Sequence, residues 1–210
     1  MNLTRLVGLC AAILAFGAGC RSPEVRFYMM PTPPPNEGER PDGFAVVIAA
    51  IEVPHVIDRP QVVWREGKTV MNADDYHRWG ASLPAEIRRA LMEHLRALLQ
   101  SDTIVAEPAD LPGPDTLRLT VFIQQLDARP KGRVDLRAVY TVRRGDDREP
   151  VVRDVADVHV PVKGDLPSDV VIGYGDAVEA LATHIAEHMR NLAKKAPPAA
   201  APAPAPTPTP

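Results

Sequence analysis

Three segments in the second half of the chain alternate between apolar and other side chains, and this alternation limits the possible folds most strongly. The segments cover residues 117–124, 134–143 and 152–160. A two-residue period places successive side chains on opposite faces of a β-strand, and a largely apolar face has to be covered. Short turn sequences at 130–132 and 145–146 separate the segments. We therefore expect three sequential antiparallel strands with one buried face.

Two segments with a helical period are expected to cover that face. In the first, over residues 82–100, Ser82 can cap the helix and Pro84 suits its first turn. The second covers residues 169–192 and follows Ser168 as a possible cap. Large apolar side chains recur every three or four positions in both segments, which gives each helix one apolar side.

The segment before the first helix adds further strands. Residues 44–53 are almost continuously apolar, which is typical of a strand buried on both faces. Residues 61–64 and 69–71 are expected to form a short hairpin that turns at 66–67. The predicted fold class is therefore α+β: a mixed, largely antiparallel sheet with two amphipathic helices packed on one face.

Cys20 follows a pattern that is typical of a secretory signal peptide. A short start with Arg5 precedes an apolar stretch over 6–16, and three small residues lie directly before Cys20. The apolar stretch is too short to span a bilayer as a mature helix. The second cysteine, Cys10, lies within the signal and would be removed, so the mature chain would have neither a disulfide nor a cysteine nucleophile.

The residues around Cys20 resemble the lipobox of bacterial lipoproteins, although Gly17 stands where that motif usually has a large aliphatic residue. The resemblance implies a diacylglycerol on the thiol of Cys20 and an acyl chain on its new amine. Acyl chains anchor a protein stably once two or more are present. Arg21 is not acidic, which in this class implies the periplasmic face of the outer membrane. An ordinary secreted protein and an uncleaved signal anchor are the alternatives.

The composition suggests four parts. These are a signal peptide over 1–19, a lipidated proline-rich tether over 20–42, a folded domain over 43–193, and a disordered tail rich in proline and alanine over 194–210. Within the tether, residues 27–30 could form a short edge strand. The tail is either inert or a spacer or docking strip. The net charge of -3 offers no basic surface for nucleic acid.

Two motifs resemble the ABC-type transport auxiliary lipoprotein family: the turn Asp58-Arg59-Pro60-Gln61 and the pair Arg78-Trp79 just before the first helix. The resemblance extends from about Cys20 to Leu192 and departs in detail after Trp79. It implies a non-enzymatic subunit with two partners, an MCE-domain protein and an ABC-type permease, that move lipids between the inner and outer membranes. A lipid-binding carrier is the alternative function. A homo-oligomer is also possible.

The resemblance makes Asp58, Arg59, Gln61 and Trp79 candidate partner contacts. A structural role is the alternative for each motif. Asp58 could hold the turn through backbone hydrogen bonds while Arg59 forms a local salt bridge. Trp79 could anchor an interface, or it could cover the sheet edge beside the first helix.

Candidate catalytic and metal sites are not evident. The chain has no nucleophile-elbow, phosphate-binding or dinucleotide-binding motif. His77 lies near two aspartates, but the spacing matches no metal signature. His184 and His188 have a spacing that can bind a metal, yet no third ligand is evident, and their neighbours suggest a solvated face. We therefore expect no enzyme, no cofactor and no metal.

Overall fold

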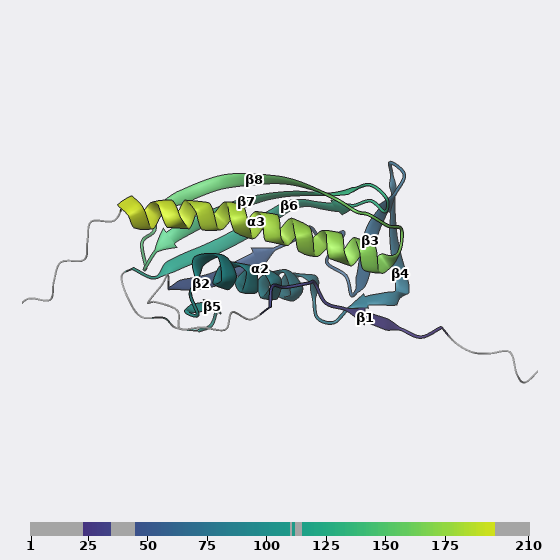
Figure 1. The fold of residues 1–210 in the computed structure, drawn as a ribbon, viewed down its shortest axis with the longest axis horizontal. Helices are drawn as coiled ribbons and strands as arrows, with labels where there is room; N and C mark the ends of the chain where they lie inside the picture. The colour runs from purple at the N-terminus through teal and green to yellow at the C-terminus, as the bar shows by residue number, and fades with distance from the viewer. Residues whose placement is uncertain (1–22, 35–44, 110, 112–114, 196–210) are drawn as a thin grey trace, which may run out of the picture.

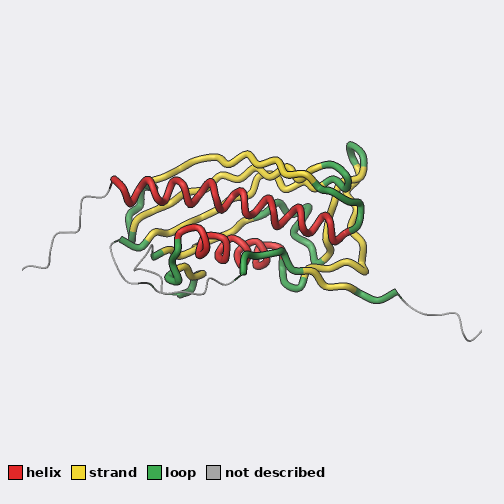
Figure 2. The backbone as a smooth tube through the Cα atoms, viewed as in Figure 1, coloured by secondary structure: helices red, strands yellow, loops and turns green. Residues whose placement is uncertain are grey.

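The structure is a computed structural model that describes residues 23–34, 45–109, 111 and 115–195. These residues form two helices, α2 (Leu83–Leu99) and α3 (Pro167–Lys195), and two sheets (Figure 1). The larger sheet has the strand order β5-β2-β6-β7-β8, formed by Ile104–Ala106, Val46–Glu52, Leu117–Ala128, Arg133–Arg144 and Val152–Pro161. Both helices lie on one side of it (Figure 2). The predicted α+β class is confirmed.

The last three strands form the expected antiparallel meander. On the face under the helices, side chains such as Leu119 and Leu136 are fully buried. The turns after β6 and β7 contain Lys131 and Gly145 in the left-handed region, with φ of 53° and 51°. A bulge near Gln125 shifts the alternation in β6. The bulge therefore keeps Leu126 and Ala128 on the face under the helices and puts Asp127 on the opposite face, across from Asp135, which the sequence period did not predict.

The apolar segment that precedes the hairpin forms β2, and it lies inside the larger sheet. It pairs in parallel with β5 on one side and with β6 on the other. Both of its edges are therefore used within the chain, which explains why Val46, Val47 and Ile48 are all fully buried.

The smaller sheet has the order β1-β4-β3, formed by Arg26–Tyr28, Val70–Trp79 and Gln61–Glu66. The hairpin of β3 and β4 turns at Gly67, whose φ is 62°. The expectation that its second strand ends at residue 71 is wrong. Strand β4 continues to Trp79 because β1 and β3 pair with its two edges, although its own side chains are mostly polar and exposed.

The folded part of the chain begins before residue 43, where the boundary of the domain was expected. Strand β1 forms within the expected tether over 20–42, in agreement with the edge strand considered there. Met30 follows it and is only 2% exposed. A Cβ on Gly175 would come within 2.6 Å of the Pro31 ring, so α3 and this segment pack closely because Gly175 has no side chain. Residues 21–22 and 35–42 of the tether, the signal peptide over 1–19, Cys20 and the tail after residue 195 lie outside the described residues.

Both helices begin differently from the expected caps. Ser82 is at the N-cap of α2 with an extended backbone, but its side chain makes no capping hydrogen bond. Helix α3 begins at Pro167, so Ser168 lies in the first turn instead of before it. There, the Asp169 carboxylate accepts a hydrogen bond from the Leu166 amide at 3.0 Å. Among the described residues, neither helix combines the length and apolarity required to cross a membrane.

Candidate functional site

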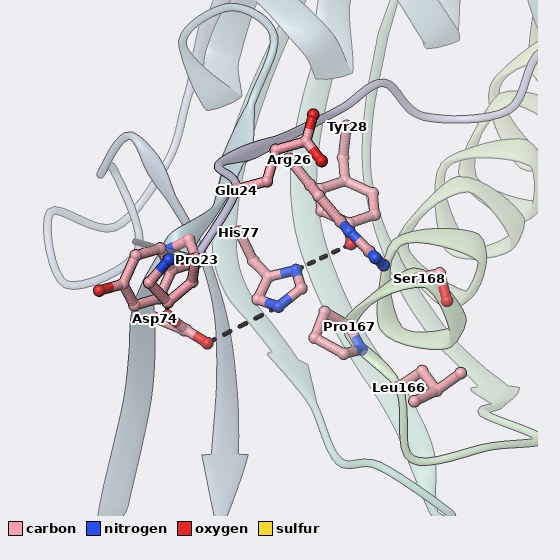
Figure 3. A pocket seen from close by; sticks show the side chains of 10 residues that line it. Pro23, Glu24, Arg26, Tyr28, Asp74, His77, Leu166, Pro167 and Ser168 are labelled. Atoms are coloured by element: carbon pink, nitrogen blue, oxygen red, sulfur yellow. Dashed lines mark hydrogen bonds and ion pairs between the residues drawn. The ribbon is translucent and has the colours of Figure 1, made fainter. Parts of the chain in front are cut away.

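An open cleft of about 430 Å³ lies where β1, β4 and the start of α3 meet (Figure 3). Its walls carry both charge signs together with apolar surface. The lining residues are Pro23, Glu24, Arg26, Tyr28, Asp74, Tyr76, His77, Leu166, Pro167 and Ser168. Three separate segments of the chain thus contribute to one cleft, which a sequence pattern alone could not bring together.

His77 joins the two strands at the floor of the cleft. Parallel pairing of β1 and β4 sets Arg26 opposite His77 and Tyr28 opposite Trp79. The hydroxyl of Tyr28 is 2.8 Å from Nδ1 of His77, and Nε2 of His77 is 3.7 Å from Oδ2 of Asp74 (Figure 3). Both ring nitrogens therefore face neighbours on opposite sides, and the imidazole fixes the strands to each other.

The Asp58 and Arg59 side chains are exposed on the turn that follows β2. The turn is held mainly by its backbone, since the amides of Ile57 and Asp58 donate to the Pro54 carbonyl at 3.0 and 3.2 Å. Nε of Arg59 donates to the Val56 carbonyl at 3.2 Å. Arg59 thus contacts a local carbonyl, where a local salt bridge was expected.

Gln61 and Trp79 lie on the smaller sheet, and their side chains contact neighbouring elements of the fold. The Gln61 amide donates to Oδ1 of Asp75 at 2.7 Å and so links β3 to β4. Trp79 is only 4% exposed, and its ring lies 5.7 Å from the ring of Tyr174 on α3. The role of Trp79 as an interface anchor stays a prediction, and in this chain its indole packs between the small sheet and α3. The alternative, a cover beside the first helix, agrees with this placement.

Cys20, the predicted lipidation site, precedes the cleft by very few residues. Pro23 lines the cleft and comes three positions after Cys20. Three residues of extended chain span at most about 11 Å. A lipid on Cys20, if the prediction holds, would lie close to this end of the domain.

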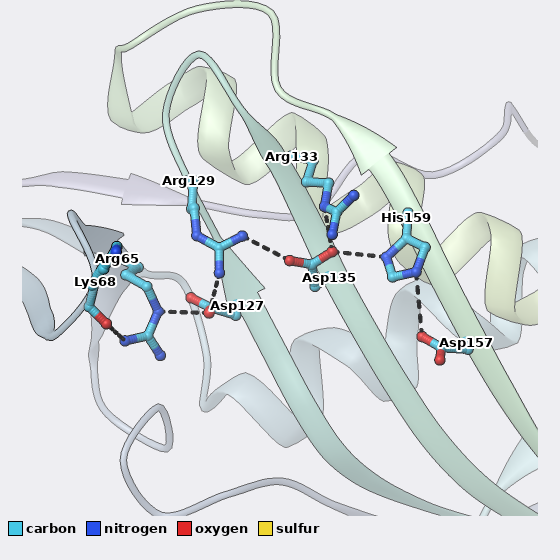
Figure 4. A network of polar contacts seen from close by, with 8 residues as sticks. All are labelled: Arg65, Lys68, Asp127, Arg129, Arg133, Asp135, Asp157 and His159. Carbon is cyan, nitrogen blue, oxygen red and sulfur yellow. Dashed lines mark hydrogen bonds and ion pairs between the residues drawn. The ribbon is translucent and has the colours of Figure 1, made fainter.

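A network of charged side chains joins the two sheets at the far end of the meander (Figure 4). Nε of Arg65, on β3, lies 2.6 Å from Oδ2 of Asp127 at the end of β6. Arg129 contacts both Asp127 and Asp135, at 3.2 and 2.8 Å. His159 extends the network to Asp135 at 2.7 Å. The sequence offered one signal for it, the charged residues at otherwise apolar ends of the alternating segments.

Electrostatics in this network favour the charged form of Asp135. Burial alone would raise the pKa of this carboxyl. The hydrogen bonds from His159 and Arg129 and the charge of Arg133 outweigh burial and hold its pKa below the usual value. A second open cleft of about 440 Å³ lies beside the network and includes Arg65 and Arg129 in its lining.

A buried carboxylate fixes the N-terminal segment to α2. Oε2 of Glu86 accepts hydrogen bonds from the Met30 amide at 3.2 Å and from Arg89 at 2.9 Å. Arg89 also donates to the Met30 carbonyl at 2.7 Å. The sequence alone could not reveal this role of Glu86, because its partner Met30 lies 56 positions away.

His184 and His188 have a third candidate ligand beside them, which the sequence did not show. Both side chains are partly buried on the side of α3 that packs against the sheet, next to Asp154 of β8. Asp154 lies on the apolar side of the third alternating segment, where the valine and alanine pattern conceals it.

Comparison with known proteins gives a family and a fold. The model of the family described as ABC-type transport auxiliary lipoprotein component matches residues 28–186. A solved structure of an uncharacterized protein has 15% identity and a TM-score of 0.62, covering 79% of this chain and 99% of that one. Protein XCC0632 from Xanthomonas campestris has 12% identity and a TM-score of 0.62, covering 81% of this chain and 98% of that one. At these identities the two structures support the fold alone. Comparison with curated proteins gave no match.

Proposed function

We propose, because this chain belongs to the family of ABC-type transport auxiliary lipoprotein components, that it is a non-catalytic adaptor on the periplasmic face of the outer membrane. Its proposed partners are an MCE-domain protein and an ABC-type permease that move lipids between the two membranes. The observation that carries the proposal is the family match, which extends over residues 28–186 and so covers nearly all of both sheets and the two helices.

The short distance from Cys20 to the fold supports the role of a fixed attachment point. With lipid on Cys20, the cleft lined by Pro23 would lie within about 11 Å of the membrane attachment. Strand β1 begins at Arg26, so the folded domain would rest against the membrane surface instead of moving on a long tether. A partner that arrives from the periplasm would then meet a surface with a restricted orientation.

The interior favours an adaptor over a lipid carrier. Fully buried side chains such as Ile48, Leu91 and Leu181 fill the space between the sheet and the two helices. The two clefts described above open to solvent and have charged walls, which suit peptide or headgroup contacts better than an acyl chain.

Membrane attachment is tested by fractionating cells that produce the full-length chain or a cysteine variant. Cys20→Ala should move the protein from the membrane fraction to the soluble periplasm. Cys10→Ala is the matched control, because it removes the cysteine within the signal and should leave the protein with the membranes. If Cys20→Ala stays with the membranes as the unaltered chain does, the lipid anchor is refuted.

Partner binding is tested by affinity purification from detergent-solubilised membranes, followed by mass spectrometry. The unaltered chain should recover an MCE-domain protein, and the double variant Asp58→Ala/Arg59→Ala should recover less of it. The control Asp146→Ala/Arg148→Ala removes an exposed charge pair from a different turn. Failure of the unaltered chain to recover any MCE-domain protein would refute the adaptor role. Equal recovery by the first double variant would refute only the contact surface at Asp58 and Arg59.

A further inference from the structure

Two histidines of α3 and one aspartate of β8 direct their donor atoms to a common point. Nε2 of His184 is 3.0 Å from Oδ2 of Asp154, and Nδ1 of His188 is 3.7 Å from the same oxygen. The three donor atoms all lie within 4.8 Å of one another. This convergence follows from the fold, because residues four apart on a helix share one side, and that side faces β8.

The sheet holds the aspartate in a defined place. The antiparallel register of β7 and β8 sets Asp154 directly opposite Tyr140. Other residues of β8 on this face are apolar, including Ala156 and Val158. The Asp154 side chain is 40% exposed, and its carboxylate accepts a hydrogen bond from His184. Two imidazoles supply donors in the structure, and imidazoles are also ligands for metals.

Two of the three donor separations are close to those around a tetrahedral metal ion. Zinc binds imidazole nitrogen and carboxylate oxygen at about 2.0–2.2 Å, which places neighbouring ligands of a tetrahedron about 3.3 Å apart. The two measured separations, 3.0 and 3.7 Å, fall on either side of this distance. We propose that Asp154, His184 and His188 form a binding site for a divalent transition-metal ion, with zinc as the best fit and one open coordination position.

Tyr140 lies against both histidines. Its hydroxyl lies 2.5 Å from Nδ1 of His188, and its buried ring packs edge-on against His184 at 5.9 Å. An ion bound to Nδ1 of His188 would take the lone pair that now faces this hydroxyl, so the hydroxyl would turn away and could contact a water molecule at the open position.

The exposure of the three side chains and the convergence of their donor atoms both agree with a site that an ion can reach from solution. The side chains of Asp154, His184 and His188 are 40%, 38% and 38% exposed, so an ion can enter without unfolding. In the part of the chain that the structure describes, this is the one group of three such residues with converging donors. His159, by comparison, directs its two nitrogens to two separate aspartates.

The site is tested with the full lipidated chain in detergent, stripped with EDTA and titrated with zinc chloride by calorimetry. We expect one zinc ion per chain. His184→Gln/His188→Gln should lower the affinity at least a hundredfold, whereas Tyr140→Phe should not lower it, because it removes only the hydroxyl that occupies Nδ1 of His188. His55→Gln, on an exposed turn, is the matched control and should bind as the unaltered chain does.

Two further measurements separate binding from folding. Cobalt in place of zinc should give the intense visible absorption of a tetrahedral ion in the unaltered chain. Zinc should raise the unfolding temperature of the unaltered chain, and this rise should be absent in Asp154→Asn. Because asparagine has nearly the same shape as aspartate, this variant keeps the test usable if the double histidine variant does not fold. Binding of less than a tenth of an equivalent by the unaltered chain, or unaltered binding by Asp154→Asn and the double histidine variant, would overturn the proposal.

Discussion

The five-stranded and three-stranded sheets are stabilised in different ways. The larger sheet buries one continuous apolar face under α2 and α3. In the smaller sheet, Trp79 is the one buried residue among the ten of β4. The smaller sheet depends more on individual contacts, such as the bond from Tyr174 to the Val63 carbonyl and the ion pair from Arg65 to Asp127. The difference suggests that α2 and the larger sheet set the overall stability, while the smaller sheet can open locally.

The largest effect should come from the packing beneath the helices. Leu91 of α2 is fully buried, so Leu91→Ala removes apolar contacts and leaves a cavity. We expect a loss of about 2–5 kcal/mol in the free energy of unfolding, measured by urea denaturation. The matched control is Ile172→Ala on α3, which shortens an exposed aliphatic side chain and should change stability by less than about 0.5 kcal/mol. Similar losses in both variants would contradict the proposed source of stability.

A smaller and more local effect is expected at the junction of α3 with the smaller sheet. The buried Tyr174 hydroxyl donates to the Val63 carbonyl at 2.6 Å. Tyr174→Phe leaves that carbonyl without its donor and should cost about 1–3 kcal/mol. Hydrogen exchange should speed up in β3 and β4 more than in β6 and β7. Tyr76→Phe, on the exposed side of β4, is the control. Equal acceleration in both sheets would show that they open as one unit.

The N-terminal segment offers a sharper test, because two effects oppose each other. Alanine favours a helix over glycine by about 1 kcal/mol, so propensity alone predicts that Gly175→Ala stabilises α3. The new Cβ would lie 2.6 Å from the Pro31 ring, and such overpacking typically costs about 1–3 kcal/mol. We expect a net loss on the order of 1 kcal/mol, measured by thermal unfolding.

A double variant checks the cause of that loss. Adding Pro31→Ala removes the ring that the new methyl group would contact, so the combined loss should be smaller than the sum of the two single losses. A stabilised Gly175→Ala variant would show that the segment moves away from α3 at little cost, and that it belongs with the locally opening sheet.

The contrast between the sheets also explains which parts of the fold the sequence could predict. The meander and both helices follow from periodic apolar side chains, and a single sequence contains that period. Strand β4 lacks such a pattern, since its stretch from Asn72 to Arg78 is mostly polar and its pairing with β1 and β3 depends on distant segments. The cleft beside β1 was therefore not predicted, although an edge strand over residues 27–30 was considered.

The candidate sites show the same limit. Asp58 and Arg59 were placed on an exposed turn because proline and aspartate mark turns locally. Glu86 with Met30, and Asp154 with His184, lie 56 and 30 positions apart, and their contacts depend on how α2 and α3 are rotated against the sheet. Helix rotation is set by side-chain packing, which no local pattern of one sequence specifies.

The smallest effect is expected from acid at the network between the sheets. The pKa of Asp135 is held below its usual value, so this carboxylate stabilises the fold above about pH 4, and the contribution is lost as the pH falls through the lowered value. Asp135→Asn should therefore reduce stability at neutral pH and weaken its decline in acid, as measured by unfolding temperatures from pH 7 to pH 3. Arg129 and His159 are partly exposed, which screens their charges and keeps the effect small. The control Asp157→Asn removes a more exposed carboxylate of the same network. If both variants decline in acid as the unaltered chain does, the network contributes little, and apolar packing alone holds the smaller sheet.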